Sequence, residues 1–253
     1  MPEVKEFSDH FGSVSSSYAK FRPTYPADLF DWLVAIVPGH AAAWDCACGS
    51  GQASVDLAAR FERVMATDAS AGQIESAVPH ARVEYRVASA EKPGLPDASV
   101  DLVTVAQALH WFDVNAFYAE ARRVARPGAL LAVWNYPRPR FVDAELDRHF
   151  LEFYGGVVGP YWPAERRHIE SNYTTLPFPF EELAHPEFGL TLRWNLEQVL
   201  GYVSSWSATA RYRKARGDDP VPLLRASLQG AWPGDGAVVE IRLPIGLRAA
   251  RLE

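Results

Sequence analysis

The feature that most constrains the fold is the run WDCACGSGQ at residues 44–52. An apolar stretch ends near a carboxylate, two glycines follow, and helix-forming residues come next, which predicts a strand, a tight loop and a helix start. Gly49 and Gly51 would let the backbone approach a ligand where a Cβ atom would collide. Such a loop before a helix is typical of sheets that bind nucleotide-like molecules.

Two carboxylates narrow the choice of ligand. A pyrophosphate loop follows the pattern G-x-G-x-x-G/A, but Ser54 stands at the third glycine position and Asp45 places a negative charge beside the loop. Asp68 ends the next short apolar run, 23 residues after Asp45. Asp68 could accept hydrogen bonds from both ribose hydroxyls or cap the following helix, and the glycine loop favours the ribose role. The pattern predicts a ligand with an adenosine, a cation and no phosphate, namely S-adenosylmethionine.

Several motifs follow one another in an order that resembles a known family. They are YAKFRPTYP at 18–26, the glycine loop, Asp68, ASAE at 88–91, AQALHWF at 106–112, ARPG at 125–128 and WS at 206–207. In these motifs the chain resembles the class I S-adenosylmethionine-dependent methyltransferases of the type 11 group, similar to trans-aconitate methyltransferases and plant embryo-abundant proteins. The resemblance implies one methyltransferase domain over residues 1–253, with S-adenosylmethionine as cofactor. The chain departs from the family loop at Ala47, where glycine is usual.

The remaining pattern predicts an α/β fold. Strands are expected at 41–46, 63–67, 83–88, 100–106, 129–135, 188–194 and 237–243, and helices near 51–60, 70–77, 113–125, 142–154 and 196–213. Alternating apolar strands and helices imply a Rossmann-like, mostly parallel sheet with helices on both faces. Seven strands are expected, because the resemblance implies a closing antiparallel pair. The aromatic and proline-rich segment 136–186 is predicted to be an insertion, either packed on the sheet edge or forming a helical substrate lid after strand five.

Ligands of such sheets lie at the carboxyl ends of the strands, where four predicted loops meet. From the loop pattern and the resemblance, we expect cofactor contacts from Tyr18, Arg22, Asp45, Ala47, Gly49, Gly51, Asp68, Ser89, Ala90 and Gln107. Asp45 is expected to orient the loop and the cationic end of the cofactor. The acceptor side is expected to include Trp111, Trp134, Tyr161 and Trp162.

His110 is the residue here whose ordinary pKa suits a general base at neutral pH, although a packed histidine is the commoner role. A carboxylate acceptor would need no base but would need cationic partners. The candidates are Arg138, Arg140, Arg166, Arg167, Arg211 and Arg213. The predicted function is therefore methyl transfer to a small-molecule acceptor, one candidate being a carboxylic acid. The alternative is a non-catalytic S-adenosylmethionine-binding regulatory module.

Composition excludes several other classes. The net charge of −6, with no basic run, disfavours generic binding to nucleic acid. The sequence lacks an apolar leader or a long uncharged apolar stretch, so we expect a cytoplasmic protein without a membrane partner. Cys46 and Cys48 lie too close for an ordinary disulfide and lack a second ligand pair, so free thiols and no metal are expected. The sequence does not indicate an oligomeric state.

Overall fold

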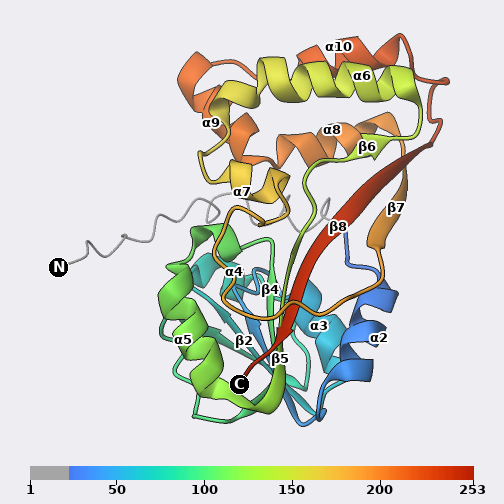
Figure 1. Cartoon of the computed structure of the whole chain (residues 1–253). Coiled ribbons are helices and arrows are strands. Elements are labelled where there is room, and N and C mark those ends of the chain that lie inside the picture. Colours follow the sequence, from blue (N-terminus) through green and yellow to red (C-terminus); the bar gives the residue numbers. More distant parts are fainter. Residues whose placement is uncertain (1–22) are drawn as a thin grey trace.

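The computed structural model describes residues 23–253 and contains a mostly parallel, Rossmann-like sheet (Figure 1). The parallel strands are β1 (Ala42–Cys46), β2 (Arg63–Asp68), β3 (Val83–Val87), β4 (Val100–Ala106) and β5 (Ala125–Asn135). The strand order is β3-β2-β1-β4-β5-β8-β6, with β7 paired to β8. The sheet therefore has eight strands rather than the predicted seven, because the two-residue strand β6 (Arg140–Phe141) also pairs with β8 (Val239–Arg251).

The central strands are buried on both faces, as helices on both sides of a sheet require. In β1, Trp44 packs on the face covered by α5 (Val114–Val124), whereas Ala43 faces α2 (Ala27–Ile36) and α3 (Gln52–Ala58). Figure 1 shows these helices on opposite sides of the strands. The short helix α4 (Ala71–Glu75) contacts β2 and β3. The carboxyl ends of the parallel strands thus form one edge above this two-sided core.

Strand β5 begins four residues earlier than predicted. Ala125 pairs with Val100 directly after α5 ends, and regular pairing resumes between Leu102 and Leu130. Gly128 lies between these two points with a φ of 78°. The motif ARPG therefore forms an irregularity within the strand, a position that tolerates proline and glycine.

A helical layer lies beyond the carboxyl ends of the strands (Figure 1). It contains α6 (Ala144–Glu152), a π-helical turn (Phe153–Val157), a 3₁₀ turn (Gly159–Tyr161), α7 (Arg166–Glu170), α8 (Leu196–Ser204), α9 (Ser207–Arg216) and α10 (Val221–Gln229). Side chains from residues 141–158 and 199–241 share one apolar core. The layer is therefore built from two chain segments, whereas the sequence indicated only the first.

The end of segment 136–186 leaves this layer and returns to the sheet. Phe178 and Phe180 pack on Tyr118 of α5, and Glu182 forms a bridge with Ala250. The first half of the segment thus joins the helical layer, and its last residues cover the sheet. Its role as a substrate lid stays a prediction.

Strand β8 joins the two layers. Its first half pairs antiparallel with β7 (Phe188–Trp194), and its second half pairs antiparallel with β5, from Gly246 to Arg251. The sequence predicted that this strand would end near 243, because Pro244 and Gly246 interrupt its alternation.

The predicted helix 196–213 is interrupted at Trp206. Trp206 has extended backbone angles, φ −75° and ψ 143°, and the hydroxyl of Thr209 donates to the Val203 carbonyl at 2.7 Å. The break separates α8 from α9, and the buried indole packs on the rings of Tyr154, Trp162 and Tyr202. In the part of the chain described, no helix combines the length and apolarity needed to cross a membrane.

Candidate functional site

The loop between β1 and α3 has a left-handed backbone at three positions. The φ angles are 55° at Ala47, 56° at Gly49 and 86° at Gly51. The Cys48 N–H donates to the Thr67 carbonyl at 3.0 Å, which fixes the loop against β2. Since L-residues with a Cβ atom rarely adopt this conformation, Ala47 carries strain that the family glycine would not.

The two glycines have different surroundings. A Cβ atom at Gly51 would collide with the Tyr85 hydroxyl. Among residues 23–253, one at Gly49 would meet only the Gln73 Oε1, at 3.7 Å. Gly51 therefore makes room for a neighbouring side chain. The described residues leave space above Gly49, as a loop that holds a ligand against its backbone requires.

Asp68 ties this loop to the end of β2. Its Oδ2 accepts from the Gly49 N–H at 2.9 Å, and its Oδ1 accepts from the Ser70 N–H at 2.8 Å. Ser70 occupies the N-cap position of α4 and makes no side-chain capping bond, so the alternative prediction of Asp68 as the N-cap residue is wrong. The half-buried carboxylate lies at the strand end beside the glycine loop.

The structure changes the interpretation of Asp45. Its side chain is 0% exposed and accepts hydrogen bonds from Ser54 Oγ at 2.5 Å and Thr104 Oγ1 at 3.0 Å. Burial raises the pKa of this carboxyl to about 6, and the two hydroxyls oppose that rise. Asp45 therefore joins β1 to α3 and β4 from inside the protein, and it does not reach the cationic end of a ligand directly.

The remaining predicted cofactor residues fall into two groups. Ser89 is half-buried and Ala90 is buried, directly after β3 at the same edge of the sheet. Tyr18 and Arg22 lie outside the described residues. The predicted cofactor residues that the structure describes thus all lie at or just after the carboxyl ends of β1, β2, β3 and β4.

Gln107, at the end of β4, has an unusual backbone. Its φ is 62°, and its N–H donates to the Trp134 carbonyl at 2.9 Å. Its Nε2 is buried and has no hydrogen-bond partner within residues 23–253. Strained residues with an unsatisfied polar group are concentrated at ligand sites.

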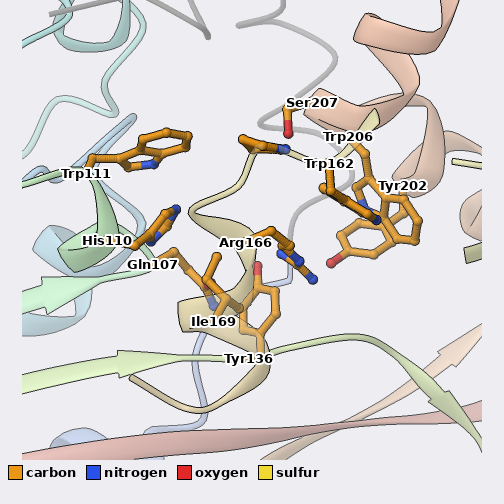
Figure 2. A pocket seen from close by; sticks show the side chains of 11 residues that line it. Gln107, His110, Trp111, Tyr136, Trp162, Arg166, Ile169, Tyr202, Trp206 and Ser207 are labelled. Carbon is orange, nitrogen blue, oxygen red and sulfur yellow. The ribbon is translucent and has the colours of Figure 1, made fainter. Parts of the chain in front are cut away.

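A cavity opens between the sheet edge and the helical layer (Figure 2). It has about 590 Å³ of space, part of it open to solvent. The lining residues come from both layers and are Gln107, His110, Trp111, Tyr136, Trp162, Pro163, Arg166, Ile169, Tyr202, Trp206 and Ser207. Five of them are Trp or Tyr, none is Asp or Glu, and Arg166 is the lining residue that is cationic at every physiological pH.

Arg166 is held in place by neutral groups. Its guanidinium lies over the Trp162 ring at 4.4 Å, its Nε donates to the Tyr154 hydroxyl at 3.0 Å, and its Nη2 donates to the Pro137 carbonyl. No carboxylate of residues 23–253 forms an ion pair with it. The cavity therefore contains a fixed positive charge suited to an anion.

His110 lies on the opposite wall, beside Trp111 (Figure 2). Its ring is 7% exposed, and Nδ1 lies 3.3 Å from the Tyr173 hydroxyl. Burial lowers its pKa from 6.5 to about 3, and the nearby Arg166 and His168 add to this shift. The ring is neutral at pH 7, so the ionisation expected near neutrality is displaced far into the acid range.

The predicted acceptor residues separate into two pairs. Trp111 and Trp162 line the cavity. Trp134 does not, because it is 0% exposed and packs with Tyr25 and Phe30 under α2. Tyr161 does not line it either, since its ring packs on Tyr212 at 4.9 Å.

The structure also separates the candidate arginines. Arg138 pairs with Asp147 and Arg213 with Asp219, whereas Arg140, Arg167 and Arg211 are exposed. Arg166 alone among the six candidates lines the cavity. Sequence reasoning missed six lining residues, namely Tyr136, Pro163, Ile169, Tyr202, Trp206 and Ser207. A signal existed only for Trp206 and Ser207, which form one of the motifs shared with the family.

Comparisons with known proteins agree with this geometry. A family described as a methyltransferase domain matches residues 44–133, which include the end of β1, the glycine loop, Asp68 and most of β5. A Dictyostelium discoideum protein named as a methyltransferase is 36% identical over 264 residues, covering 100% of this chain and 98% of its own length. A malonyl-[acyl-carrier protein] O-methyltransferase from Dechloromonas aromatica is 29% identical over 204 residues, covering 71% of this chain and 73% of its own.

The fold is also that of a solved methyltransferase. A structure described as a type II methyltransferase from Anaeromyxobacter dehalogenans superposes with a TM-score of 0.86 and 47% identity, covering 92% of this chain and 98% of the other. The sheet and the strand-end loops define a class I, nucleotide-binding α/β enzyme. The chain belongs to the S-adenosylmethionine-dependent methyltransferases, with S-adenosylmethionine as cofactor. The alternative of a non-catalytic binding module is set aside by this membership.

Proposed function

We propose that the enzyme transfers a methyl group to the carboxylate of a small organic acid and so forms its methyl ester. The observation that carries the proposal is Arg166. Among the described residues it has no ion-pair partner, and none of those that line the cavity is acidic. The name of the Dechloromonas relative, an O-methyltransferase of a malonyl group, supports an acid as acceptor.

The described residues suit the cofactor at the edge formed by the four loops. The open space above Gly49 would take the methionine and ribose part against the backbone, and Asp68 would accept from the ribose hydroxyls. Ser89 and Ala90 would lie at the adenine. The unpartnered Nε2 of Gln107 would donate toward the methionine end or the acceptor, since it lies at the strand end and lines the cavity.

When bound, S-adenosylmethionine supplies an electrophilic methyl group, and its sulfur keeps the electron pair of the broken bond. The protein then has to hold the acceptor in line and exclude competing nucleophiles. A carboxylate is ionised at pH 7 and needs no base. This requirement agrees with the neutral His110, whose lowered pKa of about 3 makes it a weak proton acceptor.

The acceptor itself would lie between the aromatic walls. Trp111 borders the cavity on the sheet side, and Trp162, Trp206 and Tyr202 border it on the helical side, with Arg166 between (Figure 2). Nε and Nη2 of Arg166 already donate to Tyr154 and Pro137, so Nη1 is the nitrogen that would donate to a carboxylate oxygen of the acceptor. Methylation removes the negative charge and thereby weakens this contact, which favours product release.

The test is to incubate the enzyme with a mixed organic-acid fraction and S-adenosylmethionine carrying a deuterated methyl group. Mass spectrometry should find labelled products that release labelled methanol in alkali, as esters do. Arg166→Leu should lose most of this labelling, whereas Arg167→Leu, an exposed neighbour on α7, should keep it. Labelled products that resist alkali, or equal labelling by both variants, would contradict a carboxylate acceptor.

A further inference from the structure

The environment of His110 suggests a role for a residue that does not line the cavity. The His110 ring stacks on the Tyr173 ring at 6.0 Å, with 28° between the planes, and Nδ1 faces the Tyr173 hydroxyl at 3.3 Å. Nδ1 is therefore turned away from the cavity that His110 lines. The second ring nitrogen, Nε2, is the one that an acceptor in the cavity can meet.

Tyr173 is held in place by several independent contacts. It is 0% exposed, and its N–H donates to the His168 carbonyl at 2.7 Å. Arg248 donates from Nη1 to the Tyr173 carbonyl at 2.9 Å and is itself paired with Glu182. These contacts keep the phenol beside His110.

The backbone at this point is strained. Asn172 and Tyr173 have φ angles of 50° and 62°, both in the left-handed region. Gly246 makes room for the turn, because a Cβ atom there would collide with the Asn172 side chain. Consecutive left-handed residues other than glycine persist only where surrounding contacts impose them, and such strain is concentrated at functional sites.

The direction of the hydrogen bond follows from the surroundings of the phenol. Burial raises the pKa of the Tyr173 phenol far above its ordinary value, so the phenol keeps its proton. Tyr173 is 0% exposed, and Nδ1 of His110, at 3.3 Å, is the hydrogen-bonding atom that the described residues place beside its hydroxyl. Since a buried hydroxyl proton requires an acceptor, this proton is directed to Nδ1 of His110.

We propose that Tyr173 is a positioning residue that fixes His110 in the tautomer with the proton on Nε2, so that His110 donates a hydrogen bond to the methyl acceptor. The contact would hold one carboxylate oxygen while the other forms the bond to the methyl carbon. His110 then acts as a neutral donor beside the cation Arg166, and it takes no proton. This inference rests on the proposed function for the identity of the acceptor, but the tautomer does not depend on it.

The tautomer can be measured without any acceptor. Nitrogen-15 NMR of the full chain, labelled at histidine and saturated with S-adenosylhomocysteine, should show His110 protonated at Nε2, with the signal assigned by its loss in His110→Gln. Tyr173→Phe should abolish this preference. Tyr118→Phe removes a hydroxyl of the same core, one that donates to the Pro177 carbonyl, and should leave it unchanged. A proton on Nδ1 in the parent protein would overturn the proposal.

A pair of substitutions then tests donation to the acceptor, with the labelled-methyl reaction on the organic-acid fraction as readout. The amide of glutamine can donate from near the position of Nε2, whereas that of asparagine lies near Nδ1. We expect His110→Gln to keep most of the rate. His110→Asn should react roughly tenfold more slowly, as expected for the loss of one hydrogen bond. Equal losses in both would overturn the donor role. Absence of labelled acids would count against the proposed function alone, because the tautomer is read separately.

Discussion

The strand-end loops and the helical layer differ in the chemical groups that they present to a ligand. The loops use backbone groups and carboxylates, and the contacts of Gly49, Asp68 and Asp45 are made within the sheet edge. The cavity above uses aromatic side chains and one cation. Within residues 23–253, the buried Nε2 of Gln107 and Nε1 of Trp162 at this cavity have no hydrogen-bond partner. Such unsatisfied groups suit a ligand that completes their hydrogen bonds.

The two regions also differ in charge. Asp45 and Asp68 lie below the loop edge, where a cationic sulfonium ligand is favoured, and Arg166 lies across the cavity, where an anion is favoured. This separation predicts that changes in one region alter the affinity for one ligand and leave the affinity for the other.

The largest effect is expected at Asp68, the side chain shared by the loop and β2. Asp68→Ala should weaken S-adenosylhomocysteine binding by roughly ten- to over a hundredfold, because hydrogen bonds to a charged group contribute about 1.5–3 kcal/mol. Asp68→Asn keeps one acceptor oxygen and should lose less. Calorimetric titration measures both variants, and an unchanged dissociation constant for Asp68→Ala would remove this residue from the cofactor site.

His110 should make the free energy of unfolding depend on pH. Its folded pKa is lowered to about 3 by burial, so between pH 6.5 and 3 only the unfolded state takes up the proton. Stability is therefore lost as pH falls, by about 2 kcal/mol at pH 5 relative to pH 8. Asp45 has a raised pKa, so its contribution to the free energy of unfolding increases as the pH falls. Because Asp45 is present in both proteins, comparing the parent with His110→Gln isolates the contribution of His110. If the free energy of unfolding of the parent and of His110→Gln changed by the same amount between pH 8 and pH 5, the pKa of His110 would not be lowered in the folded protein.

An intermediate effect is expected at the acceptor wall. Trp162→Leu removes the ring under Arg166 and should raise the KM for the acid by roughly 2- to 30-fold, a loss of about 0.5–2 kcal/mol. The affinity for S-adenosylhomocysteine should not change. Trp32→Leu, a half-buried tryptophan on α2, is the control and should leave the KM unaltered. A loss of cofactor affinity in Trp162→Leu would break the separation of the two regions.

The smallest effect is expected at Ala47. Because its φ is 55°, Ala47→Gly should raise the free energy of unfolding by about 0.5–1 kcal/mol and leave or improve cofactor affinity. Ala98→Gly, at a φ of 45° in an exposed turn, should give a similar gain with no change in affinity. Lower stability in Ala47→Gly would mean that the methyl group packs more favourably than its conformation costs.

The sheet and the loop edge were predictable because their signals are local. Residues 44–52 contain a strand, a turn and a helix start in one continuous run, and the ends of the five parallel strands can be located from the apolar pattern. The seven-strand prediction missed only the two-residue β6, which is too short to show a period. The continuation of β8 was missed because Pro244 interrupts the alternation that signals a strand.

The cavity could not be predicted in the same way. Tyr136, Arg166 and Trp206 are distant in sequence, and only the tertiary fold brings them together. The six candidate arginines were equivalent until ion pairs and exposure distinguished them. Trp134 shows the opposite error, since an aromatic residue one position from the strand end faces the core rather than the site.

The most direct test of the two-region account is calorimetric titration of S-adenosylhomocysteine into Arg166→Leu, with Arg167→Leu as control. The account places Arg166 on the acceptor side, so both variants should bind S-adenosylhomocysteine as the parent does, within about twofold. A loss of roughly tenfold or more in Arg166→Leu alone would show that this arginine holds the carboxylate of the cofactor instead. That result would contradict the separation of cofactor and acceptor on which the proposed function depends.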